Sequence, residues 1–146
     1  MPDINILIVD DEEELRDNLS DLVEDSVDSV TTAENGLEAL NLVKNGHNFA
    51  CIISDIQMPI MNGVEFIKEF RKFDEKTPFV FFTAHGNREL MLEAIQYGAF
   101  DFIDKPHFDN LFDVIDKVTI EQEIKKKPTT QEEDESKLLD EFEKIK

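Results

Sequence analysis

Short runs of apolar residues alternate along this chain with longer stretches whose apolar residues recur every three or four positions. The runs predict five strands, at residues 4–9, 30–33, 49–54, 78–83 and 99–103. Three of these runs are almost continuously apolar, as expected for parallel strands that are covered on both faces. The run at 30–33 is shorter and more polar, which favours a place at the edge of a sheet.

The stretches between the runs predict five amphipathic helices. Their apolar faces are expected to consist of Leu15, Leu19, Leu22 and Val23; Leu37, Leu40 and Val43; Val64, Ile67 and Phe70; Met91, Ala94 and Ile95; and Phe108, Leu111, Phe112, Ile115 and Val118. Gly46 is expected to end the second helix. Five strand–helix units in succession predict an α/β fold, a doubly wound parallel sheet with right-handed crossovers and helices on both faces.

The composition changes near residue 120. Lysines at 125–127 followed by Pro128 are expected to end the fifth helix. We therefore predict one domain over residues 1–122 and a charged C-terminal extension over residues 123–146. A helix near residues 131–146 would carry an apolar stripe made of Leu138, Leu139, Phe142 and Ile145. A disordered charged tail is the alternative that the sequence leaves open.

Charge and composition exclude several classes of partner and location. The chain has 34 acidic against 15 basic residues, a net charge of -19, which repels nucleic acids and anionic membranes. No apolar run is long enough to span a bilayer, and the N-terminus lacks the pattern of a signal peptide. Cys51 is the single cysteine, so no disulfide forms within the chain. These features indicate a cytoplasmic protein in which Cys51 is a small core residue.

Polar residues stand where four of the predicted strands end. Asp10 and Asp11 follow the first strand, Asp55 the third, Thr83 closes the fourth, and Lys105 follows the fifth. The carboxyl ends of parallel strands are where an open α/β sheet places its ligand site. Three carboxylates, a hydroxyl and an ammonium group suit a divalent cation and a phosphoryl group. A carboxylate can attack phosphorus and form an acyl phosphate, so the pattern predicts phosphoryl transfer.

These residues, in this order, resemble the receiver domain of bacterial two-component response regulators. The resemblance covers residues 1 to about 120 and includes the run at 55–63, which matches the family's Asp-x-x-Met-Pro-x-x-x-Gly. It implies a flavodoxin-like fold with strand order 2-1-3-4-5. It also implies that Asp55 is the phospho-acceptor and that Lys105 contacts the phosphoryl group. The Lys105-Pro106 bond is expected to be cis.

The resemblance further implies a metal site and a switch. The Mg²⁺ ligands would be Asp10, Asp11, Asp55 and the backbone carbonyl of Gln57. Thr83 would be the switch hydroxyl and Phe102 the switch aromatic, at a position where many members of the family carry Tyr. A plain core role for Phe102, sharing a strand face with Phe100, stays open.

Some of these residues have simpler interpretations. Asp11 precedes a helix and could be its N-cap. Gln57 and His85 occupy positions that often tune the lifetime of the acyl phosphate in receiver domains, but they could equally be exposed loop residues. His47 and His107 show no metal-ligand spacing and are expected to be structural.

Taken together, the sequence predicts a phosphorylation switch that is not an enzyme beyond its own phosphorylation and dephosphorylation. A histidine kinase or phosphotransfer protein would supply the phosphoryl group to Asp55 with Mg²⁺. An unknown output protein would read the face formed by the fourth helix, fifth strand and fifth helix. The segment after this domain is too short and too acidic to be a DNA-binding domain. A homodimer through this face or through the tail would also fit.

Two other functions would use much of the same pattern. A phosphorelay intermediate would pass its phosphoryl group on to another histidine protein. A phosphatase of the haloacid dehalogenase type also uses a strand-end Asp, Mg²⁺, Thr and Lys. That class needs a second acid two residues after the nucleophile, where this chain has Gln57.

Overall fold

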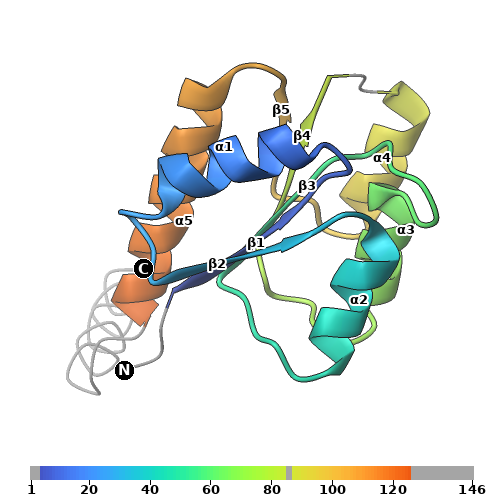
Figure 1. Cartoon of the computed structure of the whole chain (residues 1–146). Helices are drawn as coiled ribbons and strands as arrows, with labels where there is room; N and C mark the ends of the chain where they lie inside the picture. Colours follow the sequence, from blue (N-terminus) through green and yellow to red (C-terminus); the bar gives the residue numbers. More distant parts are fainter. Residues whose placement is uncertain (1–3, 85–86, 126–146) are drawn as a thin grey trace, which may run out of the picture.

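The computed structural model describes residues 4–84 and 87–125, and in them strands and helices alternate strictly (Figure 1). His85 and the extension after residue 125 lie outside this part of the chain. The elements are β1 (Asn5–Val9), α1 (Glu13–Val23), β2 (Ser29–Ala33), α2 (Gly36–Lys44), β3 (Cys51–Ser54), α3 (Gly63–Phe70), β4 (Phe79–Thr83), α4 (Arg88–Gln96), β5 (Asp101–Asp104) and α5 (Phe108–Lys125).

The strands form one parallel sheet in the order β2-β1-β3-β4-β5. Figure 1 shows α1 and α5 on one face of the sheet and α2, α3 and α4 on the other. This arrangement confirms the predicted fold class and the strand order. It also confirms that the second strand is an outer strand of the sheet. None of the described helices is both long and apolar enough to cross a lipid bilayer.

The core has two layers because the sheet is covered on both faces and side chains alternate along each strand. One layer contacts α2, α3 and α4 and includes Leu7, Val9, Ile52, Phe79 and Phe81. The other contacts α1 and α5 and includes Ile6, Ile8, Ile53, Val80 and Phe82. The alternation explains the continuous apolar runs in the sequence. Cys51 is fully buried in the second layer, as predicted.

Three residues that we predicted on apolar helix faces are exposed instead. Leu22, Leu37 and Ile95 expose 47%, 40% and 55% of their surface. Each stands next in sequence to a buried residue, and consecutive residues of a helix point about 100° apart. The buried neighbours Val23 and Ala94 take the position against the sheet, so the predicted apolar faces were too wide.

The strand register brings four loops to one edge of the sheet. Val9 lies opposite Ser54, Ser54 opposite Phe81, and Thr83 opposite Asp104. The loops after β1, β3, β4 and β5 therefore open at this edge, which we call the carboxyl edge. The opposite edge, where the strands begin, is called the amino edge.

Candidate functional site

Three carboxylates predicted to share a site meet at the carboxyl edge. Oxygen atoms of Asp10, Asp11 and Asp55 lie within 4.8 Å of one another. Asp10 and Asp55 are buried and Asp11 is exposed. Asp10 and Asp11 come from the loop between β1 and α1, whereas Asp55 directly follows β3. Its backbone N–H donates to the Val9 carbonyl at 2.9 Å, which fixes Asp55 beside the end of β1.

Lys105 reaches this group from the loop after β5. Its Nζ donates to Oδ2 of Asp10 and to Oδ2 of Asp55, both at 2.8 Å. Its backbone N–H donates to the Thr83 carbonyl at 2.9 Å, and the Lys105-Pro106 peptide bond is cis. The side chain is 12% exposed. One ammonium group is therefore shared by two buried carboxylates that come from different strands.

The electrostatics of the site favour an additional cation. Burial raises the pKa of Asp10 above its ordinary value, although hydrogen bonds from Lys105 and from the backbone of Glu12 act against this. Burial alone would lower the pKa of Lys105, but its bonds to Asp10 and Asp55 outweigh burial and raise that pKa. Lys105 stays charged and leaves carboxylate charge in excess, and a divalent ion would offset it.

The loop after β1 is shaped by backbone bonds as well as by carboxylates. Oδ1 of Asp10 accepts from the Glu12 N–H at 2.9 Å, and Nη1 of Arg16 donates to the Asp10 carbonyl at 2.6 Å. The N-cap of α1 is Glu12, without a side-chain cap bond, so Asp11 is not the N-cap. Sequence reasoning missed the buried Arg16. A charged residue among the leucines of the first helix was the available signal.

The loop after β3 holds Asp55 through its backbone. Oδ1 of Asp55 accepts from the Ile56 N–H at 2.6 Å. Gly63 packs so closely on this turn that a Cβ there would lie 2.2 Å from the Asp55 carbonyl oxygen. Asn62 caps α3 through a reciprocal capping box with Glu65. The glycine that ends the 55–63 motif is thus required by close approach, and Gln57 is exposed in the same loop.

The two candidate switch residues lie in the neighbouring strands β4 and β5. Thr83 is buried at the end of β4. Phe102 is half-buried in β5 and its ring stacks on Phe81, with 5.4 Å between ring centroids. Phe100 precedes β5 and is 40% exposed, so the expectation that Phe100 and Phe102 share a strand face is wrong. The two rings differ in exposure because Phe100 lies before the strand, which begins only at Asp101.

The donor set suits a hard cation. All three side chains offer oxygen ligands, which Mg²⁺ prefers, and Mg²⁺ commonly keeps several waters beside one or two carboxylates. Burial raises the pKa of Asp10, and the nearby Asp55 charge adds a smaller contribution in the same direction. Asp10, Asp11 and Asp55 could therefore hold a metal ion. His47 and His107 are not part of this group.

Comparison with known proteins identifies the family. Residues 6–116 match the sequence profile of the response regulator receiver domain. This match covers well over half of the chain, and the chain therefore belongs to the receiver-domain family of two-component signalling. Receiver domains bind Mg²⁺ at an acidic pocket, which is the kind of site that the three carboxylates form.

Relatives of known class are similar over most of the chain. The chemotaxis protein CheY of Bacillus subtilis is 37% identical over 114 residues, which cover 77% of this chain and 94% of CheY. The transcriptional regulatory protein FixJ of Bradyrhizobium diazoefficiens is 32% identical over 73% of this chain. The aligned region is only 51% of FixJ, so the chain spans about half the length of that relative.

Solved structures show the same fold. A CheY-like receiver domain protein from Methanospirillum hungatei superposes with a TM-score of 0.77 at 26% identity, covering 82% of this chain and 96% of that one. CheY of Borrelia burgdorferi, solved as a complex with CheX, BeF₃ and Mg²⁺, superposes with a TM-score of 0.65 at 30% identity. That match covers 70% of this chain and 78% of the other.

Proposed function

We propose that Asp55 accepts a phosphoryl group from a histidine kinase or a phosphotransfer protein, and that the chain acts as a phosphorylation switch. The observation that carries this proposal is the Lys105 ammonium at 2.8 Å from both Asp10 and Asp55. With Asp11 beside them, one edge of the sheet holds a nucleophile, a fixed positive charge and carboxylates for a cation.

The transfer step follows from these groups. A carboxylate oxygen of Asp55 forms the new O–P bond while the N–P bond of the donor phosphohistidine breaks. The electron pair of that bond stays on the imidazole nitrogen of the donor. Lys105 neutralises charge on the phosphoryl oxygens as they move to Asp55. Mg²⁺ held by Asp10, Asp11, Asp55 and the carbonyl of Gln57 would neutralise further charge on those oxygens.

The output is proposed to be a protein contact on the face formed by α4, β5 and α5. Leu92, Ile95 and Phe100 are exposed there, and Phe102 lies inward against Phe81. Thr83 is proposed to bind the phosphoryl group through its hydroxyl. An output protein shifts this equilibrium only by its different affinity for the two states. The Borrelia complex, in which a related CheY is bound by a protein with BeF₃ and Mg²⁺, supports a partner of this kind.

Storage of the phosphoryl group fits the site better than turnover of external esters. A phosphatase of the haloacid dehalogenase type needs an acid two residues after its nucleophile. Gln57 occupies that position, and an amide cannot transfer the proton that such turnover requires. We therefore propose that the chain is not an enzyme beyond reactions at Asp55 itself. A generic phosphate ester should not be hydrolysed in a standard assay.

The test is labelling of the full chain with acetyl phosphate and Mg²⁺, read on a phosphate-affinity gel. Asp55→Asn is expected to lose the shifted band completely. Asp104→Asn is the matched control because Asp104 also ends a strand at this edge and is exposed. That variant should be labelled like the unmodified chain, and a metal chelator should prevent labelling of both. A Mg²⁺-dependent band that persists in Asp55→Asn would refute the assignment.

A further inference from the structure

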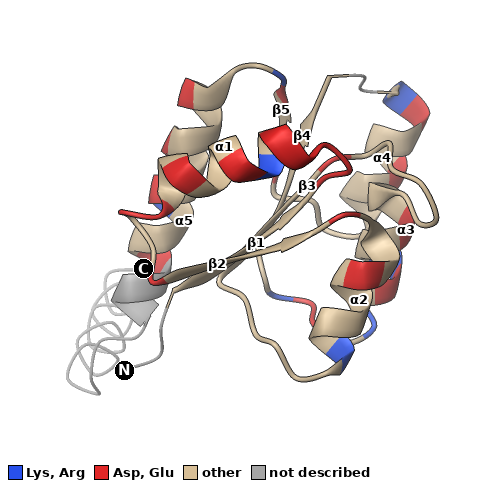
Figure 2. Cartoon of the chain, viewed as in Figure 1, with Lys and Arg blue, Asp and Glu red and all other residues tan. Residues whose placement is uncertain are grey.

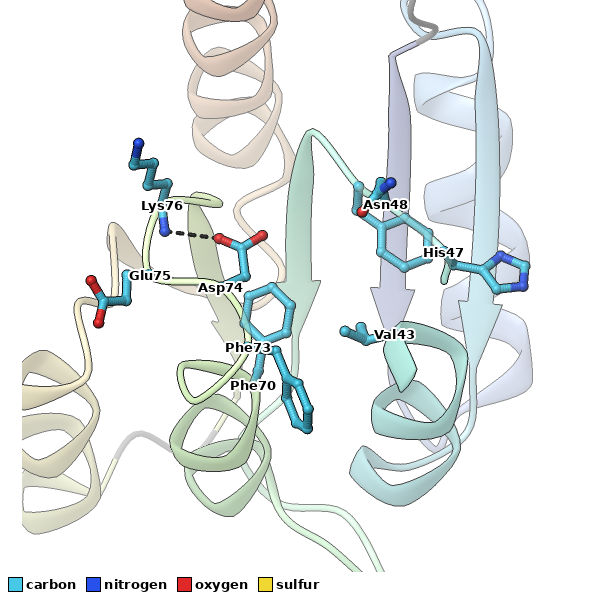
Figure 3. A pocket seen from close by; sticks show the side chains of 9 residues that line it. Val43, His47, Asn48, Phe70, Phe73, Asp74, Glu75 and Lys76 are labelled. Atoms are coloured by element: carbon cyan, nitrogen blue, oxygen red, sulfur yellow. Dashed lines mark hydrogen bonds between the residues drawn. The ribbon is translucent and has the colours of Figure 1, made fainter. Parts of the chain in front are cut away.

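A cavity of about 470 Å³ opens at the amino edge, at the opposite ends of the strands from Asp10, Asp11 and Asp55. Figure 3 shows it between the ends of α2 and α3 and the segments that lead into β3 and β4. Its apolar lining comes from Val43, Phe49, Phe70 and Phe73. Phe73 remains 59% exposed. A hollow with an exposed aromatic ring marks a surface suited to binding an apolar side chain.

The stretch that provides most of the cavity lining is close to neutral by formal charge, although Asp74 and Glu75 are themselves lining residues. Half of the basic residues in the described ranges stand between residues 44 and 76, namely Lys44, Lys68, Arg71, Lys72 and Lys76. Figure 2 shows blue segments at the lower end of α2 and in the loop from α3 to β4, whereas red dominates α1 and its preceding loop. In a chain of net charge -19, an acidic segment meets less repulsion there than beside the strongly acidic α1.

Several charges around the cavity are already engaged. Lys72 pairs with Glu69 at 3.0 Å. The Asp74 carboxylate accepts backbone N–H bonds from Lys76 at 2.8 Å and Thr77 at 2.9 Å, so it is committed to its own loop. Among the residues that the structure describes, neither Lys44 nor Lys76 forms an ion pair.

The end of the described chain lies at the same edge as the cavity. Helix α5 follows β5 at the carboxyl edge and runs back across the sheet, so Lys125 reaches the amino edge (Figure 1). Residues 126–137 can span up to roughly 40 Å when extended. The segment after Pro128 contains four acidic residues at 132–135, followed by Leu138, Leu139, Phe142 and Ile145. It therefore has the reach and the composition to meet this cavity.

We propose that residues 131–146 of the same chain dock on the cavity at the amino edge. The apolar side chains of Leu139 and Phe142 pack against Phe73, and the acidic run at 132–135 faces Lys44 and Lys76. Tethering favours this occupant over a free partner because a short linker gives an effective concentration in the millimolar range.

Local charge distinguishes this surface from the exposed apolar residues of α4. Leu92 and Ile95 on α4 are 53% and 55% exposed, and they share that helix with Glu89 and Glu93. That helix also carries Arg88 but is net acidic, so an acidic tail meets more repulsion there than at the near-neutral stretch around the cavity. The docking does not depend on the phosphorylation proposed above, because its residues lie at the opposite edge from Asp55.

The test compares amide NMR spectra of the full chain and of tail variants. Phe142→Glu is expected to shift resonances within residues 43–49 and 70–76 and to leave those of residues 88–100 in place. Phe142→Leu, which keeps an apolar side chain, is the control and should give much smaller shifts.

Charge reversal provides a second measurement on the folded domain. Lys76→Glu should shift the resonances of residues 43–49 as Phe142→Glu does, and adding Glu133→Lys should return them toward the original spectrum. Lys117 is an exposed lysine on α5. Lys117→Glu should leave the resonances of residues 43–49 in place.

Each alternative result overturns the proposal. Unchanged spectra in Phe142→Glu would leave the tail undocked, and shifts confined to residues 88–100 would place it on α4. Shifts that disappear over a roughly tenfold dilution would assign the cavity to the tail of a second copy.

Discussion

The two edges of the sheet each combine an aspartate with a cationic side chain, but they use them differently. At the carboxyl edge, Lys105 is shared by Asp10 and Asp55 through bonds of 2.8 Å each. At the amino edge, the Asp74 carboxylate accepts from the backbone of Lys76 and from both the backbone and the hydroxyl of Thr77. Asp10 and Asp55 each accept one backbone N–H bond and share one ammonium group, whereas Asp74 accepts three bonds from its own loop.

The pKa values reflect this contrast. Burial raises the pKa of Asp10. Burial also acts to raise the pKa of Asp74, but the bonds from Thr77 and Lys76 and the nearby Arg71 charge outweigh it and lower that pKa. A carboxylate satisfied by its own loop stabilises the fold, whereas crowded carboxylates leave binding capacity for a ligand. The difference separates a structural aspartate from those proposed to be functional.

Arg71, also at the amino edge, makes its hydrogen bonds within the fold. Its Nε donates to the Tyr97 carbonyl at 2.7 Å and its Nη2 to the Gly98 carbonyl at 3.0 Å. Those carbonyls lie at the C-terminal end of α4, where a positive charge is favourable. Arg71 therefore ties the end of α3 to the end of α4 without involving a ligand.

The largest expected effect comes from removing the shared cation at the carboxyl edge. Lys105→Met leaves two buried carboxylates without their partner, so the free energy of unfolding should fall by about 3–5 kcal/mol in metal-free buffer. Mg²⁺ should restore much of this loss by replacing the missing charge. Urea denaturation with and without Mg²⁺ measures both quantities.

Lys68→Met is the matched control because Lys68 is exposed, and its effect should stay within about 0.5 kcal/mol. Equal losses for Lys105→Met with and without Mg²⁺ would contradict the view that this edge is short of positive charge.

The next effect compares a glycine from each edge. Gly63→Ala would place a Cβ 2.2 Å from the Asp55 carbonyl oxygen, so the backbone must shift, at about 2–3 kcal/mol. At Gly98 a Cβ would make only ordinary van der Waals contact, 3.6 Å from Nε of Arg71, but φ is +76°, so Gly98→Ala should cost about 1 kcal/mol.

Acetyl phosphate labelling distinguishes the two glycines further. Gly63→Ala should label more slowly because the Asp55 backbone moves, whereas Gly98→Ala should label normally when compared at temperatures where both are folded. Normal labelling of Gly63→Ala would mean that the turn around Asp55 tolerates displacement.

Much of the fold and site could be predicted from sequence for one physical reason. Parallel strands covered on both faces give continuous apolar runs, and their carboxyl ends meet at one edge. Asp10 and Lys105 are 95 residues apart, yet both follow apolar runs and are joined by a 2.8 Å bond. The site residues could be predicted because they directly follow the strands.

Other features depend on geometry that residue patterns do not encode. Arg16 and Arg71 donate to backbone carbonyls, and every residue offers a carbonyl, so no sequence signal marks the acceptor. The exposure of Leu22 and Leu37 depends on how each helix is rotated against the sheet. The role of Gly63 depends on the path of a loop, although its place in the 55–63 motif did mark the position.

A smaller effect is expected from removing the satisfied carboxylate of the amino edge. Asp74→Ala removes three hydrogen bonds to Lys76 and Thr77. Because this loop is half-exposed and water can replace part of them, the free energy of unfolding should fall by about 1–2 kcal/mol.

The phosphorylation site should not respond to this change. Labelling with acetyl phosphate should be unaltered, which distinguishes Asp74 from Asp55. Thr77→Val completes a double-mutant cycle, and the coupling with Asp74 should be clearly nonzero. Purely additive losses would show that the Thr77 hydroxyl does not stabilise the loop through Asp74.

The smallest expected effect is a difference in the sign of pH dependence between the edges. The folded pKa of Asp74 is lowered, so its contribution is present above the unfolded pKa of about 3.9 and is lost as pH falls through the folded value. The folded pKa of Asp10 is raised without metal. The unfolded chain therefore releases that proton first, and stability falls as pH rises from about 3.9 through the folded value.

Denaturation of Asp74→Asn and Asp10→Asn across acidic pH in a metal chelator separates the two contributions. Asp74→Asn should lose less stability on acidification than the unmodified chain does, because the group that must be protonated is gone. Asp10→Asn should lose less stability as pH rises, since no buried carboxyl remains there to ionise. Mg²⁺ should remove the Asp10 slope and leave the Asp74 slope unchanged, because the metal favours the ionised form only at the carboxyl edge. If both variants changed the pH dependence in the same direction, the two edges would not differ in how they satisfy their carboxylates.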